Sequence, residues 1–197
     1  MHPNPAPADY PIHPLIRDRW SPRAISPQPV EREKLLACLE AARWAPSSYN
    51  EQPWRYVVVT SDTPERLAEA QSVLVEGNAW AKRAPVLVCS AAKLTLTRNG
   101  QPNRHAMHDV GAASLNFFLE AFHQGLVAHE MAGFDVEKAR EVFHIPDGFE
   151  PAAMIALGYQ DDPAVLPPER AVQEIAPRKR RPLTELVFEE DWEQPIS

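Results

Sequence analysis

Two arginines near the start of the chain are spaced so that they could bind one anion together. Arg19 and Arg23 are four positions apart with Ser21 between them, so two guanidinium groups and a hydroxyl can converge on a phosphate. Two solvated surface arginines would show the same pattern. The spacing therefore indicates a candidate phosphate site and leaves this simpler alternative open.

The stretch APSSYNEQPWRYVVV, residues 45–59, concentrates neutral hydrogen-bonding side chains between an apparent helix and an apparent strand. A helix that ends at Pro46 and a turn after it would account for the serines and for Asn50. The same turn does not account for Gln52-Pro53-Trp54. This surplus of donors and acceptors calls for a function besides chain reversal.

Other chemically competent side chains carry weaker signals. His105 and His108 would share one helix face, but no third distant ligand group is evident, and the apolar segment around them favours packing over metal binding. Cys38 and Cys89 lie far apart without CxxC or Cys/His spacing, so we expect buried thiols rather than a disulfide or a zinc site. No catalytic role is assigned to His129 or Glu130.

The elements that would position these side chains alternate between helix and strand. Pro29 fits the first position of a helix that ends near Pro46, and Thr63-Pro64 begins a second helix. Strands are predicted for residues 55–60, 85–91 and 152–159, with an extended stretch up to Met131 and a turn at 146–148. Helices are predicted for residues 105–124 and 135–144.

Two segments suggest contact with another subunit. Small and bulky apolar residues leave the helix at 105–124 little purely polar face, so it is either buried or packed on a partner. Residues 160–182 are rich in proline, and residues 183–188 then regain a short strand-like pattern. A surface-crossing arm that ends in one more strand often pairs with another chain.

Composition limits the class of protein. A chain of 197 residues with 44% hydrophobic residues can bury one sizeable core, so one compact domain is expected. The net charge of −7 disfavours nucleic-acid binding, with the basic run at 178–181 as a local exception. The apolar runs are too short to span a bilayer and residues 1–16 lack a signal pattern, which predicts no membrane association and a cytoplasmic location.

Five segments, in order along the chain, resemble the nitroreductase family of FMN-dependent oxidoreductases. They are Arg19-Trp20-Ser21-Pro22-Arg23, Pro46 to Arg55, Asp109-Val110-Gly111-Ala112-Ala113, Gly125-Leu126 with Met131 to Asp135, and Ile155 to Tyr159. The resemblance implies an α+β fold with a central mixed β-sheet flanked by helices, in an obligate homodimer that exchanges C-terminal arms. It also implies FMN in two clefts at the dimer interface. The expected division is an arm at 1–16, the FMN-binding domain at 17–160 and a C-terminal extension at 161–197.

The resemblance assigns the polar residues to parts of FMN, which needs cations for its phosphate and neutral donors for its ring and ribityl chain. Arg19, Ser21 and Arg23 match the family's phosphate motif, and Arg178 and Arg180 loosely match a late basic pair. The register within residues 178–181 stays open, and a nuclear-localisation or nucleic-acid patch is the competing interpretation.

The loop before the first predicted strand is implied to reach the flavin that is bound mainly by the other subunit. Its candidate contacts are Pro46, Ser47, Ser48, Asn50 and Gln52. Helix termination and a turn remain the alternative.

The stretch Met131-Ala132-Gly133 matches the place where the family lays backbone over the central flavin ring. A backbone N–H directed at flavin N5 would stabilise developing negative charge there, and Gly133 would permit close approach. Ala132 stands where the best-known members carry an acidic side chain, so no side-chain role survives at this position. Asn78 either contacts the flavin or caps a helix.

The activity that the resemblance implies is hydride transfer from NADH or NADPH to FMN and then to a small-molecule acceptor such as a nitroaromatic or a quinone, with ping-pong kinetics. The sequence holds no GxGxxG motif, consistent with one pocket used in turn by donor and acceptor. The alternatives are a member that fragments flavin or removes halogens, or a non-catalytic FMN-binding redox module.

Overall fold

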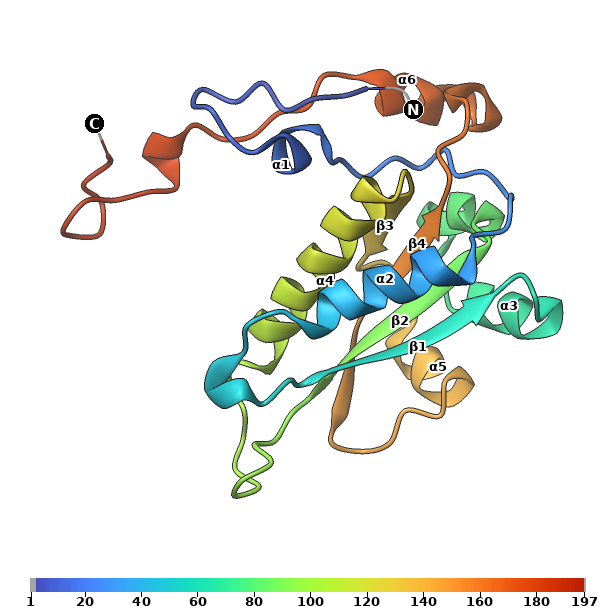
Figure 1. The fold of residues 1–197 in the computed structure, drawn as a ribbon, viewed down its shortest axis with the longest axis horizontal. Helices are drawn as coiled ribbons and strands as arrows, with labels where there is room; N and C mark the ends of the chain where they lie inside the picture. The colour runs from blue at the N-terminus through green and yellow to red at the C-terminus, as the bar shows by residue number, and fades with distance from the viewer. Residues whose placement is uncertain (1–2, 197) are drawn as a thin grey trace.

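A four-stranded sheet lies between two layers of helices (Figure 1). The computed structural model describes residues 3–196. The strands are β1 (Trp54–Thr60), β2 (Val86–Lys93), β3 (Val127–Met131) and β4 (Phe149–Gly158), in the order β1-β2-β4-β3. The strands predicted within residues 55–159 are therefore present, with ends that differ by a few residues.

The prediction of a mixed sheet is wrong, because all three strand pairs are antiparallel in the part of the chain that the structure describes. The connection from β1 enters β2 at the same end of the sheet at which β1 leaves it, and there the Ser61 amide donates to the Pro85 carbonyl at 2.8 Å. A parallel pair would need the connection to run back to the opposite end of the sheet before the chain re-enters it.

The helices and 3₁₀-helices have the following bounds: α1 Pro14–Asp18, α2 Arg32–Arg43, η1 Ser48–Asn50, α3 Pro64–Gln71, η2 Glu76–Arg83, α4 Ala106–His123, α5 Val136–Val142, η3 Pro163–Val165, α6 Pro168–Ile175 and η4 Leu183–Glu185. Helices α2 and α4 cover one face of the sheet, and α3 and α5 cover the other (Figure 1). Each face therefore has its own apolar core.

Alternation along the strands divides the apolar side chains between these two cores. On β2, Val86 and Val88 point toward α2 and α4, whereas Leu87 and Cys89 point to the opposite face. Phe117 of α4 is fully buried on the first of these faces. Cys38 and Cys89 are both buried free thiols, as predicted.

Local helix signals were only partly correct. Pro64 occupies the first turn of α3, although the Thr63 side chain makes no capping hydrogen bond. Asp135 caps α5 by accepting a hydrogen bond from the Lys138 amide at 2.9 Å. Helix α2 begins at Arg32 rather than at Pro29, because the chain is still extended at Glu31.

The C-terminal extension differs most from expectation. Residues 183–188 were expected to form a strand, but they contain the 3₁₀-helix η4, and Phe188 forms an isolated bridge with Pro195. A strand needs a neighbouring strand to satisfy its backbone, and this segment lies away from the sheet (Figure 1). Helix α6 was not predicted in the proline-rich stretch, where Pro168 stands in its first turn.

The N-terminal arm runs beside this extension (Figure 1). The Asn4 side chain donates to the Ala176 carbonyl at 3.1 Å, and Arg178 donates to the Asn4 carbonyl at 3.2 Å. The described part of the arm is therefore laid on the surface of the protein. The C-terminal basic run is thereby held against residues 3–19.

Candidate functional site

Three arginines from the two ends of the chain lie close together. Burial lowers the pKa of Arg19, and the positive charges of Arg178 and Arg180 lower it further. Burial, followed by the charge of Arg180, likewise lowers the pKa of Arg178, with Asp18 acting in the opposite direction. Partly buried guanidinium groups that repel one another favour the binding of an anion between them.

Ser21 and Arg23 have different neighbours within this motif. Arg19 Nη1 approaches the Ser21 hydroxyl at 3.4 Å. Arg23 lies on the side of His129, where its charge helps to lower the pKa of that histidine. Helix α1 ends at Asp18, so residues 19–23 are not helical and the four-residue spacing does not by itself align the two arginines. The approach of the C-terminal run to Arg19, through which the charges of Arg178 and Arg180 act on it, supplies the clustering instead.

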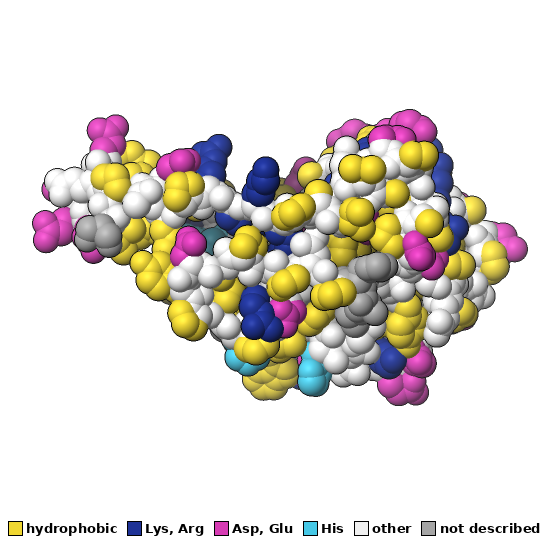
Figure 2. Space-filling view, turned by 90° about the horizontal axis from the view of Figure 1, so that it is seen from above, with side chains coloured by type: hydrophobic (Ala, Val, Ile, Leu, Met, Phe, Trp, Pro, Cys, Tyr) yellow, Lys and Arg dark blue, Asp and Glu magenta, His cyan; other side chains and the backbone are white. Residues whose placement is uncertain are grey.

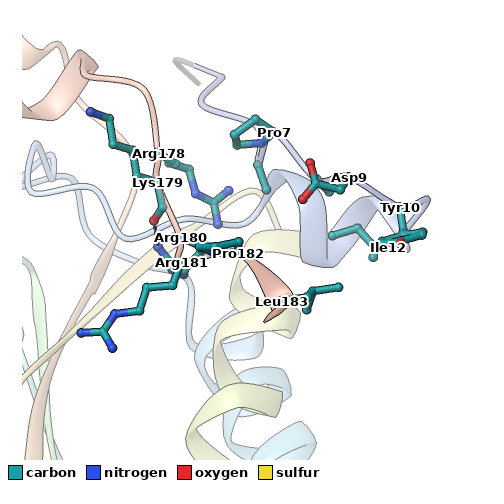
Figure 3. A pocket seen from close by; sticks show the side chains of 12 residues that line it. Pro7, Asp9, Tyr10, Ile12, Arg178, Lys179, Arg180, Arg181, Pro182 and Leu183 are labelled. Carbon is teal, nitrogen blue, oxygen red and sulfur yellow. Dashed lines mark hydrogen bonds between the residues drawn. The ribbon is translucent and has the colours of Figure 1, made fainter. Parts of the chain in front are cut away.

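A hollow lies beside Arg178 and Arg180. A groove of about 670 Å³ is lined by residues 6–10 and Ile12 of the arm and by residues 178–183 (Figure 3). In the space-filling view, Lys and Arg side chains gather in the hollow on this face (Figure 2). A second hollow of about 540 Å³ lies next to it, between residues 3–6 and Arg17, Asp18, Trp20 and Phe122.

The loop at residues 46–52 has an unusual backbone. Tyr49, Asn50 and Gln52 have φ values of 54°, 57° and 48°, in the left-handed region that non-glycine residues seldom adopt. Such conformations cost about 1 kcal/mol or more each and persist only when surrounding contacts impose them. Here the Ser48 amide donates to Asp109 of α4 at 3.0 Å, and the Gln52 amide donates to the Ser47 hydroxyl at 3.0 Å.

Part of the polar surplus in this loop therefore shapes the loop itself. Ser47 accepts within it, and Gln52 Nε2 donates to the Asn50 carbonyl at 3.1 Å. The side chains of Asn50 and Gln52 remain exposed to solvent, available to a ligand. A second loop braces them, because Glu51 accepts from the Thr97 amide at 2.7 Å and Arg98 lies 4.2 Å over the Tyr49 ring.

The end of β3 is shaped by close contacts. Met131 is buried, Ala132 is exposed and Gly133 is half-buried. Asn78 of η2 donates to the Gly133 carbonyl at 2.8 Å, and a Cβ on Gly133 would lie only 2.8 Å from Asn78 Nδ2. Asn78 thus holds the backbone of this stretch, and its contact with the flavin stays a prediction. Trp80, two residues after Asn78, packs against His129 with 4.6 Å between the ring centroids.

The loop at 46–52 and the hollows near the arginines do not meet within a single chain. The loop at 46–52 contacts α4 at Asp109, in its first turn, whereas the hollow beside Arg17 and Trp20 includes Phe122, in its last turn. At about 1.5 Å per residue, these two points are roughly 20 Å apart along the helix. The loop therefore lies at the first turn of α4, and the hollow that adjoins the groove of Arg178 and Arg180 lies at its last turn.

Comparison with known proteins gives a consistent result. Residues 16–159 match the nitroreductase family. A solved crystal structure of an oxidoreductase containing FMN superimposes with a TM-score of 0.91 and 36% sequence identity, covering 98% of this chain and 99% of the other. The chain belongs to the nitroreductase family. The resemblance read from the five sequence segments is thus confirmed.

Two relatives within curated proteins carry more specific names. An NADH dehydrogenase from Thermus thermophilus is 29% identical in an alignment that covers 78% of this chain and 91% of the relative. A nitrobenzene nitroreductase from Ectopseudomonas oleovorans is 48% identical over 59 residues, or 30% of this chain and 26% of the relative. The second likeness is therefore local.

Sequence reasoning missed Glu174, which is the one buried carboxylate of the C-terminal extension among the described residues. Its Oε1 atom accepts hydrogen bonds from the amides of Arg23 and Ala24. Its partners are about 150 positions away, so no local pattern could reveal it. Residues 3–196 contain no cluster of three or more His, Cys, Asp or Glu side chains suited to a metal ion, and no helix there is long and apolar enough to cross a bilayer.

Proposed function

We propose that this nitroreductase-family chain is an FMN-dependent oxidoreductase that takes hydride from NADH or NADPH and passes electrons to a small organic acceptor. The observation that carries the proposal is the cluster of Arg19, Arg178 and Arg180, whose mutual repulsion an FMN phosphate would relieve. The similar oxidoreductase containing FMN, which aligns over nearly the whole chain, supports the identity of the anion.

Residues of this chain fit the chemical groups of FMN. Arg19, Ser21, Arg23, Arg178 and Arg180 would hold the phosphate through charge-assisted hydrogen bonds. The exposed amides of Asn50 and Gln52, with Pro46, Ser47 and Ser48 shaping their loop, would bind the polar edge of the ring.

The backbone of Met131, Ala132 and Gly133 would lie along the flavin, positioned by Asn78. Bound FMN supplies the hydride acceptor and donor chemistry, so a protein nucleophile is not required. The protein's own task is to bind, to orient and to provide a backbone donor that offsets negative charge on the flavin.

The separation of the two half-sites favours a dimeric enzyme. One chain places its arginine cluster and its polar loop at opposite ends of α4, so a second copy in antiparallel contact would bring the loop of one to the cluster of the other. Met107 and Leu115 on the outward face of α4 are 44% and 49% exposed, which suits such a contact. We therefore propose a homodimer with two equivalent FMN sites, completed by the C-terminal extension.

The acceptor class rests on the local likeness to a nitrobenzene nitroreductase. The absence of a GxGxxG motif supports one pocket shared by the electron donor and the acceptor. A single pocket used in turn by nicotinamide and by a nitroaromatic or quinone gives ping-pong kinetics. Initial rates measured with NADH at several nitrobenzene concentrations should give parallel double-reciprocal lines. Intersecting lines would contradict the shared pocket, and an absence of turnover with every acceptor would favour a binding module.

A further inference from the structure

The backbone of residues 21–24 is held from one side by a buried carboxylate. Glu174 Oε1 accepts from the Arg23 amide at 2.6 Å and from the Ala24 amide at 2.8 Å. Its side chain is only 1% exposed, and it belongs to α6, the helix that immediately precedes the basic run. The helix that supplies this acceptor thus leads directly into the segment that carries Arg178 and Arg180.

The same backbone is held from the other side by a histidine. His129 Nδ1 lies 3.0 Å from the Pro22 carbonyl. Because a carbonyl oxygen can only accept, Nδ1 carries the hydrogen and the Nε2 atom is left without one in the neutral ring. Burial lowers the pKa of His129 to about 4, so the ring is neutral around pH 7. Packing against Trp80 fixes its orientation.

A purely structural role explains these contacts poorly. Residues 19–24 belong to no helix or strand, so these side-chain contacts define much of the path of the backbone there. Burying a carboxylate is costly, and Glu174 Oε2 is buried without a hydrogen-bond partner. An apolar side chain would hold α6 against the body at lower cost. Unlike an apolar side chain, the Glu174 carboxylate accepts hydrogen bonds and so orients the amides of Arg23 and Ala24.

We propose that Glu174 and His129 are positioning residues for phosphate binding: they fix the backbone of residues 21–24, the segment that carries Ser21 and Arg23 and directly follows Arg19. The inference rests on the proposed FMN function and adds to it two residues that touch no ligand. Since α6 supplies the acceptor and leads into the basic run, its docking and phosphate binding are coupled.

Paired ligands provide the test, because riboflavin shares the ring and ribityl chain of FMN but lacks the phosphate. Dissociation constants for both are measured by fluorescence on the full-length chain after its flavin has been removed. Glu174→Met should weaken FMN by about tenfold or more and riboflavin by less than about threefold, since a misplaced charge-assisted contact is lost. Glu174→Gln should retain FMN, because both amides donate to a single oxygen that a carboxamide also supplies.

The histidine offers an independent pair of variants. His129→Phe keeps a ring against Trp80 but removes the donor, whereas His129→Asn places an amide N–H near the position of Nδ1. We expect His129→Phe to lose FMN selectively and His129→Asn to recover most of the affinity. Glu169→Met, on the exposed side of the same helix, is the matched control and should bind both ligands as the wild type does.

The outcomes separate the possible failures. Equal weakening of FMN and riboflavin in Glu174→Met and His129→Phe would show a general structural role and overturn the inference. Unchanged affinities in both variants would overturn it as well. If Glu174→Met does not fold, the His129 pair decides alone. A wild-type chain that binds neither flavin would overturn the proposed function itself, and this inference with it.

Discussion

His129 has a well-defined protonation state because it is buried between Trp80 and the Pro22 carbonyl. Its pKa is lowered from 6.5 to about 4, chiefly by burial, so the unfolded chain binds a proton between these values and the folded chain does not. The free energy of unfolding therefore falls as pH decreases from about 6.5 toward 4, by at most about 1.4 kcal/mol per pH unit.

This linkage predicts a difference between two proteins. Between pH 7 and pH 5, the wild type should lose on the order of 1 to 2 kcal/mol more stability than His129→Asn, as measured by urea unfolding. Glu130, whose pKa burial raises, contributes the opposite trend but is present in both proteins. Identical pH dependence in the two would show that His129 titrates normally in the folded chain.

The two cysteines also have a residue-scale consequence. Burial raises the pKa of both Cys38 and Cys89 to about 12, so at pH 8 only about one thiol in ten thousand is ionised. Because the thiolate is the reactive species, Ellman's reagent should leave the folded protein unmodified for hours and titrate two thiols in guanidinium chloride. Rapid labelling of the folded state would contradict the buried positions.

At the scale of elements, the contact between η2 and the end of β3 shapes the backbone that we propose to face the flavin. A Cβ at Gly133 would lie 2.8 Å from Asn78 Nδ2 and 3.1 Å from Val75, so Gly133→Ala must displace the hydrogen bond from Asn78 to the Gly133 carbonyl. Gly77, in the same 3₁₀-helix, has open space around it and provides the control.

We expect Gly133→Ala to retain less than about half of the wild-type flavin after dialysis, since one lost hydrogen bond and a shifted backbone cost about 1 kcal/mol. Gly77→Ala should retain all of it. Absorbance at the flavin band, relative to protein, measures both. Full retention in Gly133→Ala would mean that this stretch does not approach the flavin.

Local patterns predicted the strands and most helices because each carried its signal in a few neighbouring residues. Asp135 before an amphipathic helix and the β-branched run in β1 are examples. Features set by distant contacts could not be predicted in this way. Glu174 finds its partners across the whole fold, and Arg19 meets Arg178 only because the arm lies on the C-terminal extension. The strand expected at 183–188 failed for the same reason, since strand formation depends on a neighbour.

For the whole molecule, the central expectation is that two chains build each site. Leu115 lies on the outward face of α4 and is 49% exposed. Burying an arginine there in a dimer interface would cost several kcal/mol without a partner. Leu115→Arg should therefore give a folded monomer that has lost FMN, as measured by light scattering and absorbance.

Two further proteins complete this experiment. Ala68→Arg adds the same charge at an exposed position of α3, on the other face of the sheet, and should remain a dimer with FMN. A chain ending at Pro182 tests the C-terminal extension and should lose both dimer and flavin. A truncated chain that remains dimeric and flavin-replete would remove the extension from this role. A Leu115→Arg monomer with a full complement of FMN would contradict a site shared between chains.

The most direct measurement is anaerobic reduction of the purified protein, followed by visible absorbance. We expect a bound flavin, released by heat and identified as FMN, at one per chain. NADH or NADPH should bleach its band within seconds, and a nitroaromatic or quinone should then restore the band without further nicotinamide. A purified chain with no flavin that also fails to bind added FMN would contradict the central claim, and a bound FMN that neither nicotinamide reduces would contradict the proposed activity.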